Sequence, residues 1–172
     1  LDFDILVNCT AYNRVDDAQS FIKETFIINS LAVQKMAQVC QLKGAKFFHV
    51  STDYVFGGNK SLYDEPLTES TSPAPINVYG ASKLLGENLA RIACENTFIL
   101  RVASLFGVAG SSGKGGNFVE TMIKFAKERP NLQVVSDQFM SPTGTEFIAS
   151  SFFKMLEAKA EPAIYNVVNS GS

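Results

Sequence analysis

Two side chains in the segment VYGASKLLGE, residues 78 to 87, have the types and the spacing of a proton-transfer pair. Tyr79 and Lys83 are four positions apart, so on a helix they share one face. A tyrosine hydroxyl has an ordinary pKa of about 10, and a nearby ammonium lowers that pKa because it stabilises the phenolate. A tyrosine adjusted in this way can exchange a proton with a carbonyl or an alcohol near neutral pH. The same spacing also fits a packed tyrosine and a solvated lysine, so the rest of the chain must decide.

The segments around this pair alternate between strand and helix patterns. Strands are predicted at 4–9, 46–51, 98–104, 132–135 and 163–168, and helices at 17–42, 77–95, 118–128 and 144–158. Gly44 is expected to end the first helix. The long polar stretch at 52–76 and the glycine-rich stretch at 107–117 are predicted loops. This alternation predicts an α/β fold with a doubly wound parallel sheet.

Polar clusters follow the first two strands of this predicted sheet. NCTAY ends the first strand and STDYVFGG ends the second. The carboxyl ends of parallel strands form the usual site of open α/β sheets, so we expect both clusters to lie near the Tyr79 helix. Thr52 is the predicted hydroxyl donor to a substrate oxygen, with Ser51 as its rival.

Composition excludes several classes of protein. The net charge is −2 and the basic residues are scattered, which disfavours nucleic-acid binding, and no apolar run is long enough for a membrane span. Cys9, Cys40 and Cys94 form no C-x-x-C motif, so we expect free thiols in the cytoplasm. The single histidine, His49, cannot build a histidine-based metal site and is interpreted as structural. We expect no leader before the first strand, and we expect both ends to be cut from a longer protein.

Five motifs, taken in order, resemble the extended short-chain dehydrogenase/reductase family. They are NCTAY, Asn29, STDYVFGG, PINVYGASK and LRVASLFG. The resemblance implies an NAD(P)-binding Rossmann-like fold, with residues 1–106 as the later part of the dinucleotide-binding domain. Residues 107–172 would contribute to a small C-terminal substrate lobe and to the last sheet strand. The family's glycine-rich cofactor turn would precede Leu1, so the sequence leaves NADH or NADPH open.

Within that family, STDYVF, GGNFVETMIKFAKE and VVSDQFMSPTGTE resemble the dTDP-4-dehydrorhamnose reductases. The resemblance implies reduction of the C4 keto group of dTDP-4-dehydrorhamnose to dTDP-L-rhamnose by NADPH or NADH. Tyr79 would be the proton donor, and Lys83 would lower its pKa and bind the nicotinamide ribose. Thr52 would bind the substrate carbonyl. Asn29 would steady a water in the proton relay.

The resemblance also implies contacts for other residues. The residues expected near the cofactor are Cys9, Thr10, Ala11, Ser51, Arg101 and Ala103, together with Tyr79 and Lys83. The residues expected near the sugar nucleotide are Asp53, Tyr54, Leu105 and Asn117. For three residues a purely structural role stays open: a turn cap for Asp53, a helix hydrogen bond for Asn29, and an ion pair for Arg101. Leu105 replaces a tryptophan of some relatives, and Met140 replaces a usual glycine.

Glu146 matches a glutamate that some bacterial relatives use in a Mg²⁺-linked dimer. A homodimer with Mg²⁺ at its interface is therefore open, although the partner glutamates would lie outside this chain.

The same motifs suggest three other functions. A non-catalytic subunit resembling the regulatory beta subunit of methionine adenosyltransferase is disfavoured, because Thr52, Tyr79 and Lys83 are all kept. A 4,6-dehydratase is disfavoured, because Tyr54 stands where that enzyme has its elimination glutamate. Another nucleotide-sugar reductase or a C4 epimerase stays open.

Overall fold

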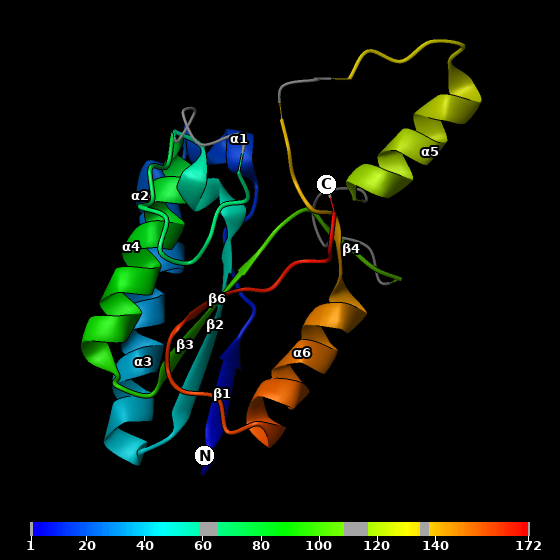
Figure 1. The fold of residues 1–172 in the computed structure, drawn as a ribbon. Helices are drawn as coiled ribbons and strands as arrows, with labels where there is room; N and C mark the ends of the chain where they lie inside the picture. Colours follow the sequence, from blue (N-terminus) through cyan, green and yellow to red (C-terminus); the bar gives the residue numbers. More distant parts are fainter. Residues whose placement is uncertain (1, 59–64, 109–116, 135–137, 172) are drawn as a thin grey trace. The chain divides into compact units, whose positions relative to one another are not determined.

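The computed structural model describes residues 2–58, 65–108, 117–134 and 138–171 (Figure 1). The chain divides into two compact units, which we describe separately. The first unit comprises Leu1–Val102 and Glu161–Asn166, and the second comprises Ala103–Ala160 and Val167–Ser172. The predicted division into a dinucleotide-binding domain and a substrate lobe stays a prediction. Among the described residues, no helix has the length and apolarity needed to cross a membrane.

The first unit is built on a four-stranded parallel sheet in the order β1-β2-β3-β6. Its strands are β1 (Ile5–Asn8), β2 (Lys46–Thr52), β3 (Thr97–Val102) and β6 (Ile164–Asn166). Every residue of β3 is buried, as expected for a central strand of a parallel sheet. The parallel α/β sheet confirms the predicted fold class.

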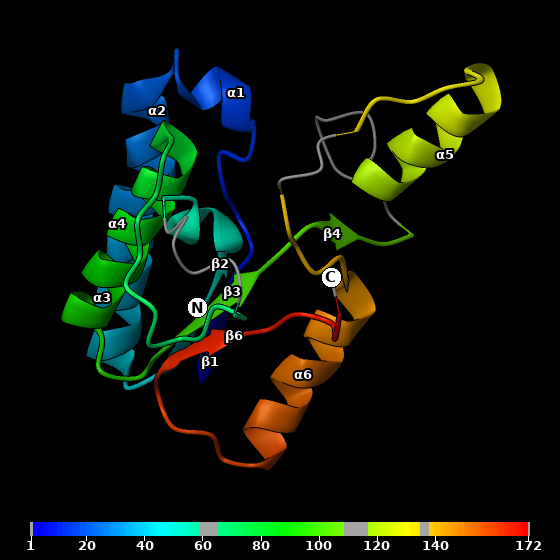
Figure 2. The same cartoon turned by 45° about the horizontal axis from the view of Figure 1, so that its top comes forward.

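Helices connect these strands on one side of the sheet. They are α1 (Val15–Ala18), α2 (Ile22–Phe26), the π-helical turn η1 (Ile27–Leu31), α3 (Ala32–Lys43), the 3₁₀ turn η2 (Asp53–Phe56) and α4 (Val78–Ala93). Figure 2 shows α3 and α4 side by side. Gly44 ends α3 in the left-handed conformation, with φ of 67°, which confirms its predicted role.

The core of this unit lies between the sheet and the pair α3 and α4. It is formed by buried apolar side chains, namely Val33, Ala37, Cys40, Ala45, Phe47, Ala90, Cys94 and Ile99. Small residues on the two helices allow close packing. A Cβ at Gly86 would lie 2.1 Å from the Asn29 carbonyl oxygen, so α4 touches η1 backbone to backbone there.

The second unit contains a two-stranded parallel ladder and two helices. Its elements are β4 (Leu105–Phe106), α5 (Phe118–Glu128), β5 (Thr143–Gly144) and α6 (Thr145–Glu157). Asn117 caps α5 in a capping box, because its side chain accepts from the Glu120 amide and the Glu120 side chain accepts from the Asn117 amide. Ser104 leads into β4 with a positive φ of 38° and donates a hydrogen bond to the Met140 sulfur.

Three expectations differ from the structure. The single helix predicted at 17–42 is interrupted, because the chain turns at 19–21 and η1 inserts a π-helical turn before α3. The strand predicted at 132–135 is wrong for the described residues 132–134, which have no ladder partner among the described strands. The ladder of β4 and β5 was not predicted, because two residues carry no periodicity. Most of the glycine-rich stretch at 107–117 lies outside the described residues.

Candidate functional site

One face of α4 carries the three polar side chains of the site at four-residue steps. Tyr79, Lys83 and Glu87 lie on successive turns, and the last two are 1% exposed. Asn77 begins the helix, because its Oδ1 accepts the Gly80 amide at 2.7 Å. The spacing of the three groups therefore follows from helix geometry alone and does not depend on tertiary packing.

Strand β2 presents the opposing polar groups. Side chains alternate along a strand, so Phe47, His49 and Ser51 share one face. Phe47 belongs to the core beneath α3 and α4, and it therefore identifies this face as the one turned to the helices. His49 contacts Lys83, and Ser51 contacts Glu87.

Tyr79 lies where β2 ends. Its ring packs edge-on against the Tyr54 ring, with centroids 5.5 Å apart. Thr52 accepts the Tyr54 amide at 3.2 Å and donates to the Asp53 carboxylate at 3.1 Å. The structure thus brings together the four predicted residues Thr52, Asp53, Tyr54 and Tyr79.

The electrostatics at Tyr79 differ from the expectation. Burial raises the pKa of Tyr79 to about 12; a hydrogen bond with the Thr52 hydroxyl lowers this pKa, and the nearby Asp53 and Tyr54 raise it. Burial likewise raises the pKa of Asp53, and a hydrogen bond with Thr52 lowers it. The lysine amine bonds to β2 in this structure, and its expected lowering of the Tyr79 pKa stays a prediction.

Lys83 is a buried amine with partners on β2. Its Nζ donates to the Val50 carbonyl at 2.7 Å and lies 3.2 Å from His49 Nε2. Burial lowers the pKa of Lys83 to about 8, although the charges of Glu87 and Cys9 raise it. Among the described residues, these are the two hydrogen-bond partners of Nζ, and one position on the nitrogen is left for a ligand hydroxyl.

Ser51 and Thr52 were predicted rivals for the hydroxyl donor, and their contacts separate them. The Ser51 hydroxyl donates to Glu87 Oε1 at 2.5 Å, so it is already used. The Thr52 hydroxyl lies beside Tyr79 at the end of the strand. This difference favours Thr52 as the group that meets a substrate oxygen.

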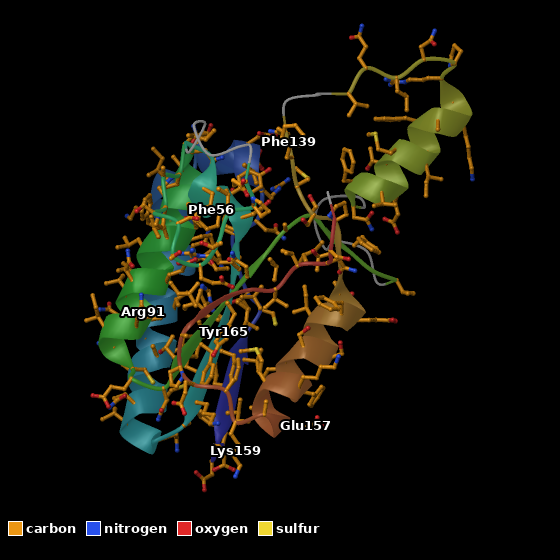
Figure 3. All side chains as sticks on the ribbon, in the orientation of Figure 1. Phe56, Arg91, Phe139, Glu157, Lys159 and Tyr165 are labelled. Atoms are coloured by element: carbon orange, nitrogen blue, oxygen red, sulfur yellow. The ribbon has the colours of Figure 1, made fainter. Side chains whose placement is uncertain are left out.

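Arg101 forms a buried ion pair. Its Nη2 and Nε donate to the Glu87 carboxylate at 2.7 to 3.2 Å, and the two side chains are 3% and 1% exposed. Its guanidinium also lies 4.9 Å from the Phe56 ring, labelled in Figure 3. Nη1 is buried and has no hydrogen-bond partner among the described residues. The ion pair fits the structural alternative for Arg101, and its contact with a cofactor stays a prediction.

Asn29 is fully buried in η1, and its carboxamide is bonded on both ends. Oδ1 accepts the Tyr12 amide at 2.7 Å, and Nδ2 donates to the Tyr12 carbonyl and to Ser82 Oγ. The side chain therefore fastens the segment after β1 to α4. Its predicted part in a water relay stays a prediction. The π-helical turn that carries it is a feature often found at functional sites.

His49 belongs to this cluster although the sequence assigned it only a structural role, and its partner is Asn8, the first residue of the predicted NCTAY cluster. Asn8 ends β1, and its Nδ2 lies 3.0 Å from His49 Nδ1. The turn of Cys9, Thr10 and Ala11 follows directly, and Thr10 bonds back to Asn8 Oδ1. Alternation along β2 could have placed His49 on the helix-facing side with Phe47. Its partner could not have been read from the sequence.

The remaining predicted residues lie in the second unit. They are Ala103, Leu105, Asn117 and Glu146. Asn117 is used as the cap of α5, and Leu105 is 40% exposed. A pocket of about 340 Å³ lies within this unit, lined by Phe106, Asn117, Glu120, Thr145 and Glu146 among others. Among the described residues, no three acidic, histidine or cysteine side chains could hold a metal together.

The residues of the first unit fit a nicotinamide cofactor. The turn after β1 exposes Cys9 at the carboxyl edge of the sheet, where such ligands bind. Lys83 Nζ has one position open for a ribose hydroxyl, and Tyr79 is the group with a transferable proton. Such an arrangement can donate a proton to a carbonyl oxygen, and the contact of Thr52 with that oxygen stays a prediction.

Known proteins are similar to this chain along nearly its whole length. The model of the RmlD substrate binding domain family matches residues 1–172. The chain is 39% identical to dTDP-4-dehydrorhamnose reductase from Escherichia coli K12 and 32% identical to that from Mycolicibacterium smegmatis, covering 98% of this chain in both cases. It covers 55% and 50% of those two proteins. The chain therefore spans about half the length of the curated relatives it matches.

Solved structures of dTDP-4-dehydrorhamnose reductases are also similar to this chain. The structure of dTDP-4-dehydrorhamnose reductase from Bacillus anthracis in complex with NADP matches with a TM-score of 0.83 at 38% identity. The Clostridium acetobutylicum ortholog matches with a TM-score of 0.86 at 32% identity. Each match covers 98% of this chain, and 57% and 56% of those chains.

Proposed function

Because the chain belongs to the RmlD substrate binding domain family, we propose that it carries the proton-donating part of a dTDP-4-dehydrorhamnose reductase. The single observation that carries this proposal is the position of Tyr79. It lies on the face of α4 that also carries Lys83, beside the Thr52 hydroxyl at the end of β2. The relatives named for this activity match 98% of the chain, which places these residues inside the matched region.

The reaction assigned to the site is the reduction of the C4 keto group of a dTDP-linked sugar. A bound NADPH or NADH would supply the hydride to the C4 carbon. Tyr79 Oη gives its proton to the C4 oxygen, so the carbonyl becomes an alcohol. Thr52 Oγ1 donates to the same oxygen and orients it.

Lys83 acts on the tyrosine during this step. Loss of the proton leaves a phenolate at Tyr79, whose formation the buried site disfavours, since burial raises the Tyr79 pKa to about 12. An ammonium at Lys83, one turn along the same helix face, lowers the cost of that charge. The Tyr79 pKa must therefore fall when the reacting groups are assembled, and a charged Lys83 is the group that can lower it.

Residues that we assign to the sugar nucleotide occur in each unit. Asp53 and Tyr54 in η2 line the end of β2, and we assign to them the contacts with the sugar hydroxyls. Asn117 and Leu105 are assigned to contacts with the sugar nucleotide, and Glu146 to a Mg²⁺-linked contact with a second copy. The pocket lined by Asn117 and Glu146 supports a ligand-binding part for this second unit.

The test is turnover by the protein expressed from its full reading frame. Oxidation of NADPH or NADH is followed with dTDP-4-dehydrorhamnose for the parent, for Tyr79→Phe and for Tyr165→Phe. Loss of one general acid lowers the rate by about 10²- to 10⁴-fold, so Tyr79→Phe should lose that much. Tyr165→Phe is the matched control, because that hydroxyl bonds only the Glu161 carbonyl among the described residues, and it should keep parent turnover.

Three outcomes would contradict the proposal. Cofactor binding without turnover would exclude this substrate and favour a non-catalytic partner protein. Turnover that persists in Tyr79→Phe would assign the proton donor to another residue. Conversion of the sugar without net loss of NAD(P)H would indicate an epimerase.

A further inference from the structure

A continuous chain of hydrogen bonds runs from the turn after β1 to the amine of Lys83. The Thr10 amide and hydroxyl donate to Asn8 Oδ1 at 3.0 and 2.6 Å. Asn8 Nδ2 lies 3.0 Å from His49 Nδ1, and His49 Nε2 lies 3.2 Å from Lys83 Nζ. Asn8, His49 and Lys83 are each 3% exposed or less, so bulk water has little access to their side chains.

The Thr10 amide, at the start of this series of hydrogen bonds, determines which group donates and which accepts in every later bond. A backbone amide can only donate, so the Asn8 atom that faces Thr10 must be the carbonyl oxygen. The Asn8 atom that faces His49 is then the NH₂ group, which also can only donate. His49 Nδ1 must therefore accept, and it carries no proton. A neutral imidazole with a bare Nδ1 carries its proton on Nε2.

This order determines what Lys83 can be. The Nε2–H of His49 points at Lys83 Nζ, so Nζ must accept a hydrogen bond. An ammonium has no lone pair and cannot accept, whereas a neutral amine accepts one bond and still donates to the Val50 carbonyl at 2.7 Å. We propose that Asn8 and His49 are positioning residues that hold Lys83 as the neutral amine in the cofactor-free protein.

The charges around Lys83 are consistent with this assignment. Burial lowers the pKa of Lys83 to about 8, while Glu87 on its own helix and Cys9 after β1 raise it. The Glu87 carboxylate is already bonded by Arg101 and Ser51, so it is not a direct partner of Nζ. Burial lowers the pKa of His49 well below its usual range, so the imidazole is neutral, and an ammonium at Lys83 would lower that pKa further. The hydrogen bond donated by His49 and the burial of Lys83 both favour the neutral amine and so lower the pKa of Lys83.

The inference deepens the proposed function, on which its catalytic consequence rests. In the resting protein Lys83 is uncharged and cannot stabilise a phenolate, which agrees with the raised pKa of Tyr79. The charged lysine forms when Nζ gains a proton and leaves the Nε2–H of His49. The ammonium then turns toward the open position where a ligand hydroxyl would bind. His49 thereby couples the protonation of Lys83 to occupation of the site.

The test uses one isosteric substitution that reverses the donor and acceptor roles along this series of hydrogen bonds. In Asn8→Asp, both carboxylate oxygens accept, so the Thr10 bonds are kept while His49 Nδ1 becomes a donor. Nε2 is then bare and accepts from a Lys83 ammonium. Nitrogen-15 spectra of the cofactor-free, full-length protein report which ring nitrogen of His49 carries the proton. Carbon-13 spectra of labelled lysine report the titration of Lys83, assigned with Lys83→Arg.

The expected result has two parts. In the parent, Nε2 carries the proton, and Lys83 titrates below about pH 8, so that the neutral amine predominates at pH 8 and above. In Asn8→Asp, the proton lies on Nδ1, and the Lys83 midpoint moves upward by about one pH unit or more. Under the proposed function, the alkaline limb of the rate profile moves upward with it.

A cycle with His49→Phe separates the relay from the added negative charge. Asn8→Asp should shift Lys83 much less in the His49→Phe background, because the intermediate group is gone. A shift of equal size in both backgrounds would overturn the inference, as would a parent His49 with a bare Nε2. If His49→Phe fails to fold, the ring-nitrogen spectra of the parent and Asn8→Asp decide alone.

These spectra need neither cofactor nor substrate. Failure of the reductase assay therefore leaves the protonation test intact, and a wrong tautomer leaves the proton donor Tyr79 untouched.

Discussion

Replacement of Lys83 by methionine should remove a pH dependence of stability that a solvated lysine does not produce. Lys83 is 1% exposed, and its pKa falls from 10.5 to about 8 because burial disfavours the ammonium. Lys83→Met keeps most of the apolar stem and removes the titrating group. The slope of stability against pH then isolates what that group contributes.

The direction of the Lys83 pKa shift determines whether stability rises or falls with pH. Between the folded pKa of about 8 and the unfolded value of 10.5, the unfolded chain binds more protons at Lys83 than the folded chain does. Stability of the parent, relative to Lys83→Met, is therefore lowest below pH 8 and rises as the pH increases toward 10.5. With these two pKa values, the relative gain between pH 7 and pH 9 is about 1.4 kcal/mol. A lower folded pKa, as the Asn8 and His49 chain implies, would make the gain larger.

The assay is urea unfolding of parent and Lys83→Met at several pH values from 7 to 9, with free energies from linear extrapolation. Cys40, whose pKa burial raises, titrates in both proteins and cancels in the difference. The raised pKa of Tyr79 destabilises the folded state only above about pH 10, outside this window. A difference that is flat from pH 7 to 9 would refute the reasoning, because it would mean that Lys83 is charged and solvated in the folded protein.

Two further predictions concern the packing that holds the site. Glu87→Gln leaves the buried Arg101 guanidinium without its counter-charge and should cost about 3 kcal/mol of unfolding free energy. Arg91→Gln, on the exposed side of α4 (Figure 3), is the control and should be close to neutral, and equal losses would contradict a special role for the ion pair. Gly86→Ala adds a Cβ 2.1 Å from the Asn29 carbonyl oxygen, so it should cost about 2 kcal/mol in the same assay; a neutral effect would mean that α4 and η1 are not in backbone contact.

Much of the fold could be predicted because local patterns carry it. Alternating apolar runs predicted the parallel α/β sheet, and α5 begins and ends at the predicted residues 118 and 128. Gly44 ended α3 as predicted, since a left-handed residue at that position favours glycine. The interrupted helix before α3 could not be predicted, because the π-helical turn is selected by the Asn29 contacts to Tyr12 and Ser82, which are distant in sequence.

The candidate site also has features that the sequence determined and features that only the tertiary structure decided. The Tyr79 and Lys83 pair was determined by the sequence, because four-residue spacing on a helix is a local property. The protonation state of that pair was decided by the tertiary structure. Burial raised the Tyr79 pKa, and the approach of β1 and β2 turned Lys83 toward His49, a residue that the sequence alone had assigned to a structural role. Charge depends on desolvation and on which donor meets which acceptor, and both arise only when separate segments of the chain pack together.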